Sequence, residues 1–192
     1  MTSELYDDFW ELVPEASGAP AREKVDFVRD LGSAERALDL GCGDGILTRE
    51  LAADELTAAD VSVVALKRAR ARLAGARIVA LDPHGPLPFE DASFDLVLCA
   101  DTLEHVPDLR RLFPEIKRVL APLGTLAITT PLHDRQTALD LLRKGFDADF
   151  DPLAPPVHRF TPATLRKVLG LAGLDPRELT TAGRTIFLLA DR

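Results

Sequence analysis

The sequence predicts an α/β fold, in which amphipathic helices cover a parallel sheet. Short apolar stretches alternate with segments of helical periodicity along most of the chain, which is typical of a parallel α/β sheet. The stretch 94–100 is apolar almost without interruption, as expected for a strand that is covered on both faces. A strand at 35–40 also runs directly into a glycine cluster, and a further apolar pattern follows that cluster.

The amino-terminal half contains the segments that lead to and from the glycine cluster. A helix is expected at 20–31, because its apolar residues lie on or near one face. The other elements expected in this half are a strand at 35–40, a helix at 45–53, a weak strand at 55–60, a basic amphipathic helix at 62–74, and strands at 77–81 and 94–100.

The carboxyl-terminal half begins with a helical pattern at 108–120. Pro114 lies inside this pattern and is expected either to kink the helix or to open a second one. The elements expected after it are a strand at 124–130, a helix from an N-cap at Thr161 to about Ala172 with a stop at Gly173, and two closing strands at 174–181 and 184–190 joined by Ala182-Gly183. Residues 132–160 are rich in Asp and Pro and fit no clean period.

Composition excludes several classes of protein. The 192 residues suit a single domain, and apolar residues at 46 % with charged residues at 28 % are close to average globular usage. The net charge of −8 argues against a non-specific nucleic-acid binder, which needs a basic face. The chain has no apolar run of about 18 residues and no apolar segment at its acidic start, so neither a membrane span nor a signal peptide is expected.

The two cysteines, Cys42 and Cys99, lie far apart in apolar stretches. They support neither a zinc ribbon nor a disulfide scaffold. Reduced thiols in a cytoplasmic protein are the simplest interpretation.

The glycine cluster Gly41-Cys42-Gly43-Asp44-Gly45 follows a strand and is the first candidate binding site. Glycines at alternate positions let the backbone approach a ligand closely and adopt positive φ angles. A nicotinamide dinucleotide would need the spacing Gly-x-Gly-x-x-Gly, but the residue at 46 is Ile. Asp39 would also repel a pyrophosphate, whereas it suits a ligand with a positive amine. An ordinary strand-to-helix turn remains the alternative.

Acidic residues end three consecutive expected strands, at Asp39, Asp60 and Asp82. Asp60 follows Gly41 by 19 residues, which is close to the spacing of the acid that binds ribose hydroxyls in such folds. The three acids should line the carboxyl edge of the sheet, where open α/β sheets bind ligands. Asp82 has a second interpretation, because it could simply begin a turn before Pro83.

With these residues, the chain resembles the class I S-adenosylmethionine-dependent methyltransferases. The resemblance is strong over about residues 35–131 and looser from His158 onward. The segments that carry it are Leu38 to Gly45, Asp60, Leu87 to Val97, Leu103 to Val106 and Arg118 to Leu126. It implies a Rossmann-like, doubly wound sheet of seven strands, mostly parallel with an antiparallel last strand. It also implies S-adenosyl-L-methionine as the cofactor.

The resemblance assigns cofactor binding to Asp39, Gly41, Gly43, Gly45, Asp60, Val61, Asp82, Pro83 and Ala100. The glycines would pack against the methionine and ribose parts, with Asp39 facing the methionine amine and Ala100 meeting the methionine end through its backbone. Asp60 would hold the ribose hydroxyls.

The adenine would lie against Val61, with Asp82 accepting from its amino group. Pro83 departs from the family pattern, because it has no N–H to donate to the adenine ring. The loss of one such hydrogen bond costs about 1 kcal/mol.

The resemblance implies methyl transfer to a small-molecule acceptor, such as a biosynthetic intermediate, by in-line displacement. A general base is needed only if the acceptor must lose a proton early. The candidate bases are Asp101, Glu104, His105 and His133, of which the two histidines are the tentative catalytic pair. Packing near the site remains the alternative for His105, and a simple loop position for His133. No metal is expected, because the four histidines have no ligand spacing.

The whole chain is expected to form one methyltransferase domain. Its parts would be an amino-terminal lid and helix at 1–30, a cofactor-binding core at 35–131, an acceptor-side insertion at 132–160, and a closing helix and hairpin at 161–192. The short length and acidic balance favour a small acceptor over RNA or protein. Methylation of RNA or protein, or cofactor binding without transfer, remain alternatives.

Overall fold

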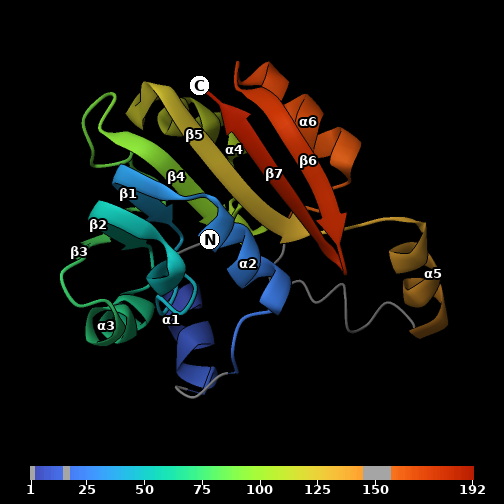
Figure 1. Ribbon diagram of the computed structural model, residues 1–192. Coiled ribbons are helices and arrows are strands. Elements are labelled where there is room, and N and C mark those ends of the chain that lie inside the picture. Colours follow the sequence, from blue (N-terminus) through green and yellow to red (C-terminus); the bar gives the residue numbers. More distant parts are fainter. Residues whose placement is uncertain (1–2, 15–17, 145–156) are drawn as a thin grey trace.

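Seven strands form a single sheet in the order β3-β2-β1-β4-β5-β7-β6 (Figure 1). The computed structural model describes residues 3–14, 18–144 and 157–192. The strands are β1 (Ser33–Leu40), β2 (Ala52–Asp60), β3 (Arg77–Ala80), β4 (Phe94–Ala100), β5 (Leu120–Pro131), β6 (Asp175–Ala182) and β7 (Thr185–Asp191).

Strands β1 to β5 pair in parallel, and β7 runs antiparallel to both β5 and β6. The predicted fold class, a mostly parallel Rossmann-like sheet with an antiparallel last strand, is therefore confirmed. The order in which strands are added to the sheet reverses between β1 and β4, because β2 and β3 lie on one side of β1 and the later strands lie on the other. Ligands of open α/β sheets bind at such a point.

Helices cover both faces of the sheet. The helices of the described residues are α1 (Ser3–Leu12), α2 (Arg22–Asp30), α3 (Val63–Arg72), α4 (Leu109–Val119), α5 (Arg135–Lys144) and α6 (Pro162–Leu171), with short 3-10 helices η1 (Thr48–Glu50) and η2 (Leu103–His105). Helix α5 stands apart from the sheet (Figure 1). The helices α4 and α6 pack on one face through Phe113 and Leu165, and α2 packs on the other through Val28. A third apolar cluster joins α3 to β2.

The helix expected at 45–53 was wrong. The structure has only the 3-10 turn η1 there, and β2 begins at Ala52 instead of residue 55. The reason is tertiary: Ala52 and Ala53 pair with Ser33 and Ala34 of β1. This backbone pairing places both alanines in a strand, although helical periodicity alone assigned them to a helix.

Other boundaries differ by smaller amounts. Pro114 lies within one helix, α4, which continues from Asp108 as its N-cap to Val119. The closing hairpin turns at Gly183-Arg184 rather than Ala182-Gly183, because Ala182 already pairs with Thr185. The predicted N-cap Thr161 is confirmed, and it forms a capping box with Thr164.

Two helices were not predicted, α1 and α5. Helix α5 lies within the aperiodic segment 132–160, part of which is outside the described residues. Helix α1 lies against α3, close to the carboxyl ends of β1 and β2.

Candidate cofactor-binding site

A cleft of about 430 Å³ opens at the carboxyl ends of β1 to β4. Seven of the residues assigned from the sequence line it: Gly41, Gly43, Asp60, Val61, Asp82, Pro83 and His105. Asp39, Gly45, Ala100 and His133 are not among its lining residues. The cleft also has a wall from α1 and a wall from α4, which contribute Tyr6, Phe9 and Trp10 and Arg111, Leu112 and Glu115, respectively.

The glycine loop passes so close to neighbouring side chains that only glycine can be accommodated at two of its positions. Gly41 and Gly43 have φ angles of +81° and +55°. A Cβ on Gly41 would collide with the Thr102 side chain, and one on Gly43 would lie 2.6 Å from the ring of Trp10. The loop is fixed to β2, since Gly41 N and Cys42 N both donate to the Ala59 carbonyl, at 2.7 and 3.0 Å.

Gly45 serves packing rather than the cleft. Its φ is +78°, and a Cβ there would lie 2.8 Å from the Leu73 side chain at the end of α3. The adjacent Asp44 is buried and pairs with Arg72 of α3 at 2.6 Å. This end of the loop is therefore held by α3.

Asp60 links the glycine loop to the start of α3. Its Oδ2 accepts from Gly43 N at 2.8 Å and its Oδ1 from Ser62 N at 2.9 Å. Burial raises the pKa of the Asp60 carboxyl, and these backbone N–H groups oppose that rise. A carboxylate oxygen has more than one acceptor position, so Asp60 can also accept from ligand hydroxyls in the cleft.

The structure is compatible with both interpretations of Asp82, as a residue of the binding site and as a turn residue. It lines the cleft, and it also forms a turn, with Oδ1 accepting from His84 N at 2.8 Å. It lies two residues beyond β3, which ends at Ala80. The backbone at this position is held by Leu81 N, which donates to the Asp60 carbonyl at 2.8 Å.

Asp39 does not face the cleft. It is buried in β1, with Oδ2 accepting from the Thr48 hydroxyl at 2.6 Å, and its Oδ1 has no hydrogen-bond partner among the described residues. Burial raises the pKa of Asp39 to about 7. A buried carboxyl of this kind costs stability in its charged form.

The two candidate histidines lie in different surroundings. His105 lines the cleft and meets the ring of Tyr6 edge to face, with centroids 6.3 Å apart. The His133 backbone N–H donates to the Phe160 carbonyl at 2.9 Å, outside the lining of the cleft. Burial lowers the pKa of both imidazoles, and Asp101 partly opposes this for His105. Both rings are therefore neutral near pH 7.

Glu104 is a buried acid that links residues 157 and 158 to the edge of the sheet at β5. It is 2 % exposed, and its Oε2 accepts from the Thr130 hydroxyl at 3.0 Å. Its backbone carbonyl accepts from Val157 N and His158 N, at 2.8 and 3.0 Å. Burial raises the pKa of Glu104 to about 7.

Helix α1 closes one side of the cleft. A side chain of α1 binds the start of α3, and a side chain of α3 binds backbone carbonyls at the end of α1. Asp7 accepts from the Ser62 hydroxyl at 2.6 Å and from Val64 N at 3.2 Å. Arg68 donates to the carbonyls of Trp10 and Val13, at 2.7 and 2.8 Å. These contacts hold Tyr6, Phe9 and Trp10 in the lining. A lid at 1–30 was expected, but the pattern of this short segment indicated neither the helix at Ser3–Leu12 nor its contacts with α3.

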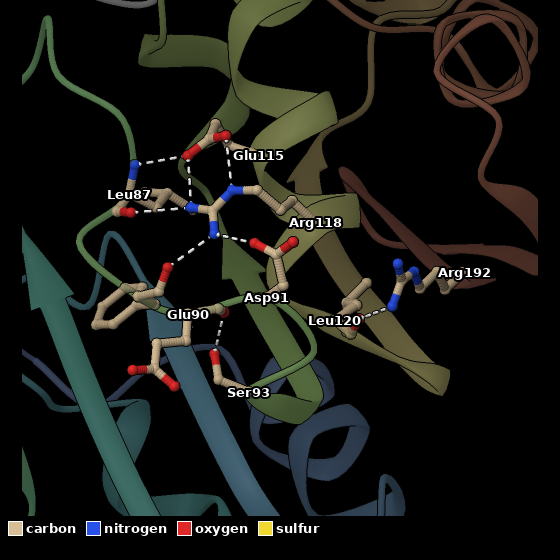
Figure 2. Close-up of polar contacts among 9 residues, drawn as sticks. Leu87, Glu90, Asp91, Ser93, Glu115, Arg118, Leu120 and Arg192 are labelled. Carbon is tan, nitrogen blue, oxygen red and sulfur yellow. Dashed lines mark hydrogen bonds and ion pairs between the residues drawn. The ribbon is translucent and has the colours of Figure 1, made fainter.

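Arg118 fixes the wall opposite α1. Figure 2 shows its guanidinium among Glu115, Asp91 and the loop that contains Leu87. It donates to both Glu115 oxygens, to Asp91 and to the carbonyls of Leu87 and Phe89, at 2.8 to 3.0 Å. Glu115 in turn accepts from Leu87 N at 2.9 Å. Leu87 and Glu115 both line the cleft.

Neither a metal cluster nor a membrane span emerges from the described ranges. No three His, Cys, Asp or Glu side chains there are grouped to hold a metal ion. No helix among them has the length and apolar character to cross a membrane.

Comparison with known proteins points to one family. Residues 38–128 match the family model of the methyltransferase domain. A demethylmenaquinone methyltransferase of Clavibacter sepedonicus is 33 % identical over 157 residues, covering 78 % of this chain and 57 % of the relative. A trans-aconitate 2-methyltransferase of Variovorax paradoxus is 36 % identical over 128 residues, covering 65 % and 49 %. The chain thus spans about half the length of the curated relatives it matches.

Solved structures share the fold at lower identity. A putative methyltransferase from Bacillus halodurans superposes with a TM-score of 0.73 at 18 % identity, over 88 % of this chain and 98 % of its own. A SAM-dependent methyltransferase from Aquifex aeolicus gives 0.69 at 20 % identity, over 98 % and 96 %.

Proposed function

Because the chain belongs to the class I S-adenosylmethionine-dependent methyltransferases, we propose that it transfers the methyl group of S-adenosylmethionine to a small-molecule acceptor. The observation that carries this proposal is the cleft at the carboxyl edge of the sheet, between β1 and β4, where the strand order reverses. There the glycine loop and the carboxylate of Asp60 lie side by side, joined by the hydrogen bond from Gly43 N.

The residues of the cleft fit this cofactor. The volume of about 430 Å³ is within the usual range for small-ligand sites, about 300–1,000 Å³. A ribose needs a hydroxyl acceptor, which Asp60 provides, and an adenine needs an apolar neighbour, which Val61 provides. Pro83 has no N–H to donate to an adenine ring nitrogen, whereas Asp82 would accept from the adenine amino group.

The chain itself would contribute positioning more than acid–base chemistry. S-adenosylmethionine, when bound, supplies a sulfonium methyl that is already activated for displacement. Orientation of two reactants can account for about 7–11 kcal/mol of a barrier. His105 is the better candidate of the two histidines for taking a proton from the methyl acceptor, because it lines the cleft and His133 does not.

The nature of the acceptor is argued from charge and from the relatives. The chain carries a net charge of −8, which disfavours RNA as the acceptor. The two relatives described above are named for demethylmenaquinone and trans-aconitate, both small molecules. These compounds are therefore the first acceptors to test.

Calorimetric titration tests the cofactor. S-adenosylhomocysteine and S-adenosylmethionine should bind in the micromolar range, and NADH should not compete. A folded sample that binds neither nucleoside would overturn the assignment. Formation of S-adenosylhomocysteine with demethylmenaquinol or trans-aconitate then separates a transferase from a protein that only binds the cofactor.

A further inference from the structure

Helix α5 carries leucines on the side that faces away from the rest of the protein. Its half-buried residues Thr137, Asp140 and Leu141 share one face of the helix at spacings of three and four residues. Leu139 and Leu142 lie on the opposite face and are 46 % and 69 % exposed. A surface helix normally turns its apolar residues toward the core, so these two leucines need a separate explanation.

Two polar contacts attach the half-buried face, here called the inner face, to the end of the sheet. The Thr137 hydroxyl donates to the Leu132 carbonyl, directly after β5, at 3.1 Å. Asp140 pairs with Arg184 of the turn between β6 and β7 at 3.5 Å. Because β5 is the parallel neighbour of β4, α5 projects from the same edge of the sheet as the cleft, and it stands apart from the strands (Figure 1). The face with Leu139 and Leu142, here called the outer face, is left to solvent.

Both charged side chains on the described part of the outer face are cations. Arg135 lies one turn before Leu139 and Arg143 one turn after it, and both arginines are exposed. The two acids of the segment are engaged elsewhere: Asp134 accepts from the backbone in the first turn of the helix, and Asp140 pairs on the inner face. The whole chain carries −8, but a Debye length of about 8 Å at physiological ionic strength screens its distant acids. A surface close to α5 therefore meets chiefly the two arginines.

We propose that α5 docks on the surface of a lipid bilayer, with Leu139 and Leu142 among the acyl chains and Arg135 and Arg143 at the level of the phosphates. Helices that lie in the interface combine an apolar stripe with cationic side chains in this way. Arginine reaches the phosphates while its stem stays in apolar surroundings. No described helix has the length to cross a bilayer, so the contact is with its surface. The inference goes beyond methyl transfer and does not depend on it.

A second copy of the chain fits this face less well. In a twofold dimer the outer face would meet itself, and the arginines of both copies would then come together without an acid between them. A stable interface also needs about 800 Å² from each partner, which is more than the outer side of one helix of 10 residues provides. A lipid surface supplies acyl chains for the leucines and phosphates for the arginines.

Flotation with vesicles of equal parts phosphatidylcholine and phosphatidylglycerol tests the proposal on the full chain. The wild type should float with the vesicles, and the double variant Leu139→Ser with Leu142→Ser should partition at least about tenfold less, because the burial of both leucines is lost. Leu123→Ser with Leu171→Ser is the matched control, since these leucines are 96 % and 81 % exposed away from α5, and it should behave as the wild type does. A wild type that stays unbound, undiminished binding of the α5 variant, or an equal loss in the control would each overturn the proposal.

The arginines give a second, electrostatic test. Arg135→Gln with Arg143→Gln should reduce partitioning about tenfold on the mixed vesicles but about twofold or less on phosphatidylcholine alone. An equal effect on both kinds of vesicle would contradict the assignment of these arginines to lipid charge. Circular dichroism checks that each variant is folded.

Two further measurements separate this proposal from the alternatives. Light scattering without lipid should show no dimer that depends on the outer face. A dimer that the variant Leu139→Ser with Leu142→Ser abolishes would make the face an interface between copies and would overturn the proposal. Binding of S-adenosylhomocysteine should be the same in every variant, and its absence from the wild type would count against the proposed function alone.

Discussion

Asp60 makes two backbone hydrogen bonds that do not depend on any ligand. One fixes Gly43 in the loop and the other fixes Ser62, the N-cap of α3. A residue that binds ribose and also joins two elements should affect both affinity and stability when it is replaced. Sequence spacing identified its position but gave no indication of this structural role.

We expect Asp60→Asn to weaken S-adenosylhomocysteine by about 1.5–3 kcal/mol, because charge-assisted bonds to the ribose hydroxyls would be lost. The free energy of unfolding without ligand should also fall, by about 1–2 kcal/mol, since one backbone N–H loses its carboxylate acceptor. Calorimetry and denaturant unfolding measure the two effects. Asp54→Asn, at the exposed start of the same strand, is the control. Unchanged affinity with reduced stability would make Asp60 purely structural.

At the scale of elements, the cleft depends on how helices are attached to its two walls. Helix α1 is held by Asp7 and Arg68 through contacts with α3. The opposite wall is held by Arg118 of α4. Both attachments use a charged side chain that binds backbone groups of a distant segment, so each can be removed by one substitution.

The attachment of α1 can be followed through Trp10, the single tryptophan of the chain. Arg68 donates to its carbonyl and lies 5.9 Å from the centre of its ring. Arg68→Met should therefore release α1, shift Trp10 emission to longer wavelength and increase quenching by iodide. Arg70→Met, on an exposed position of the same helix, should do neither. An unchanged spectrum in Arg68→Met would show that α1 stays docked without this residue.

The opposite wall can be tested with Arg118→Lys. A lysine keeps the charge but cannot reproduce the fork of donors that reaches Glu115 and two carbonyls. We expect a loss of about 1–2 kcal/mol in the free energy of unfolding, given that the side chain is partly exposed. Affinity for S-adenosylhomocysteine should fall as well, because Leu87 and Glu115 line the cleft. Arg110→Lys, exposed on the same helix, should change neither quantity.

At the scale of the whole molecule, two acids are enclosed close to the sheet edge. Burial raises the pKa of Asp39 and of Glu104 to about 7, from ordinary values of 3.8 and 4.5. The folded state therefore binds these protons more tightly than the unfolded state does. The stabilisation that they give is complete below about pH 4 and is lost as the pH rises through 7.

This stabilisation should appear as a difference between the wild type and Asp39→Asn. His105 and His133 have lowered pKa values, so their contribution changes with pH in the opposite direction, but it is common to both proteins. From pH 5 to 8 the wild-type free energy of unfolding should fall relative to that of Asp39→Asn, by at most about 1.4 kcal/mol per pH unit. Denaturant unfolding across this range measures the difference. Parallel curves, like those expected for Asp54→Asn, would contradict the raised pKa of Asp39.

The sequence by itself determined the fold class, the glycine loop and the acids Asp60 and Asp82 at the carboxyl edge. These follow from local patterns: apolar periodicity, glycine at positions of positive φ, and the rule that parallel strands end at one edge. Tertiary structure decided the rest. Strand pairing placed residues 52 and 53 in a strand, where a helix had been expected. Burial in β1 encloses the Asp39 side chain, and α1 reaches the cleft through contacts between segments far apart in the chain. Such contacts depend on the distance between side chains in space, which no spacing along the sequence records.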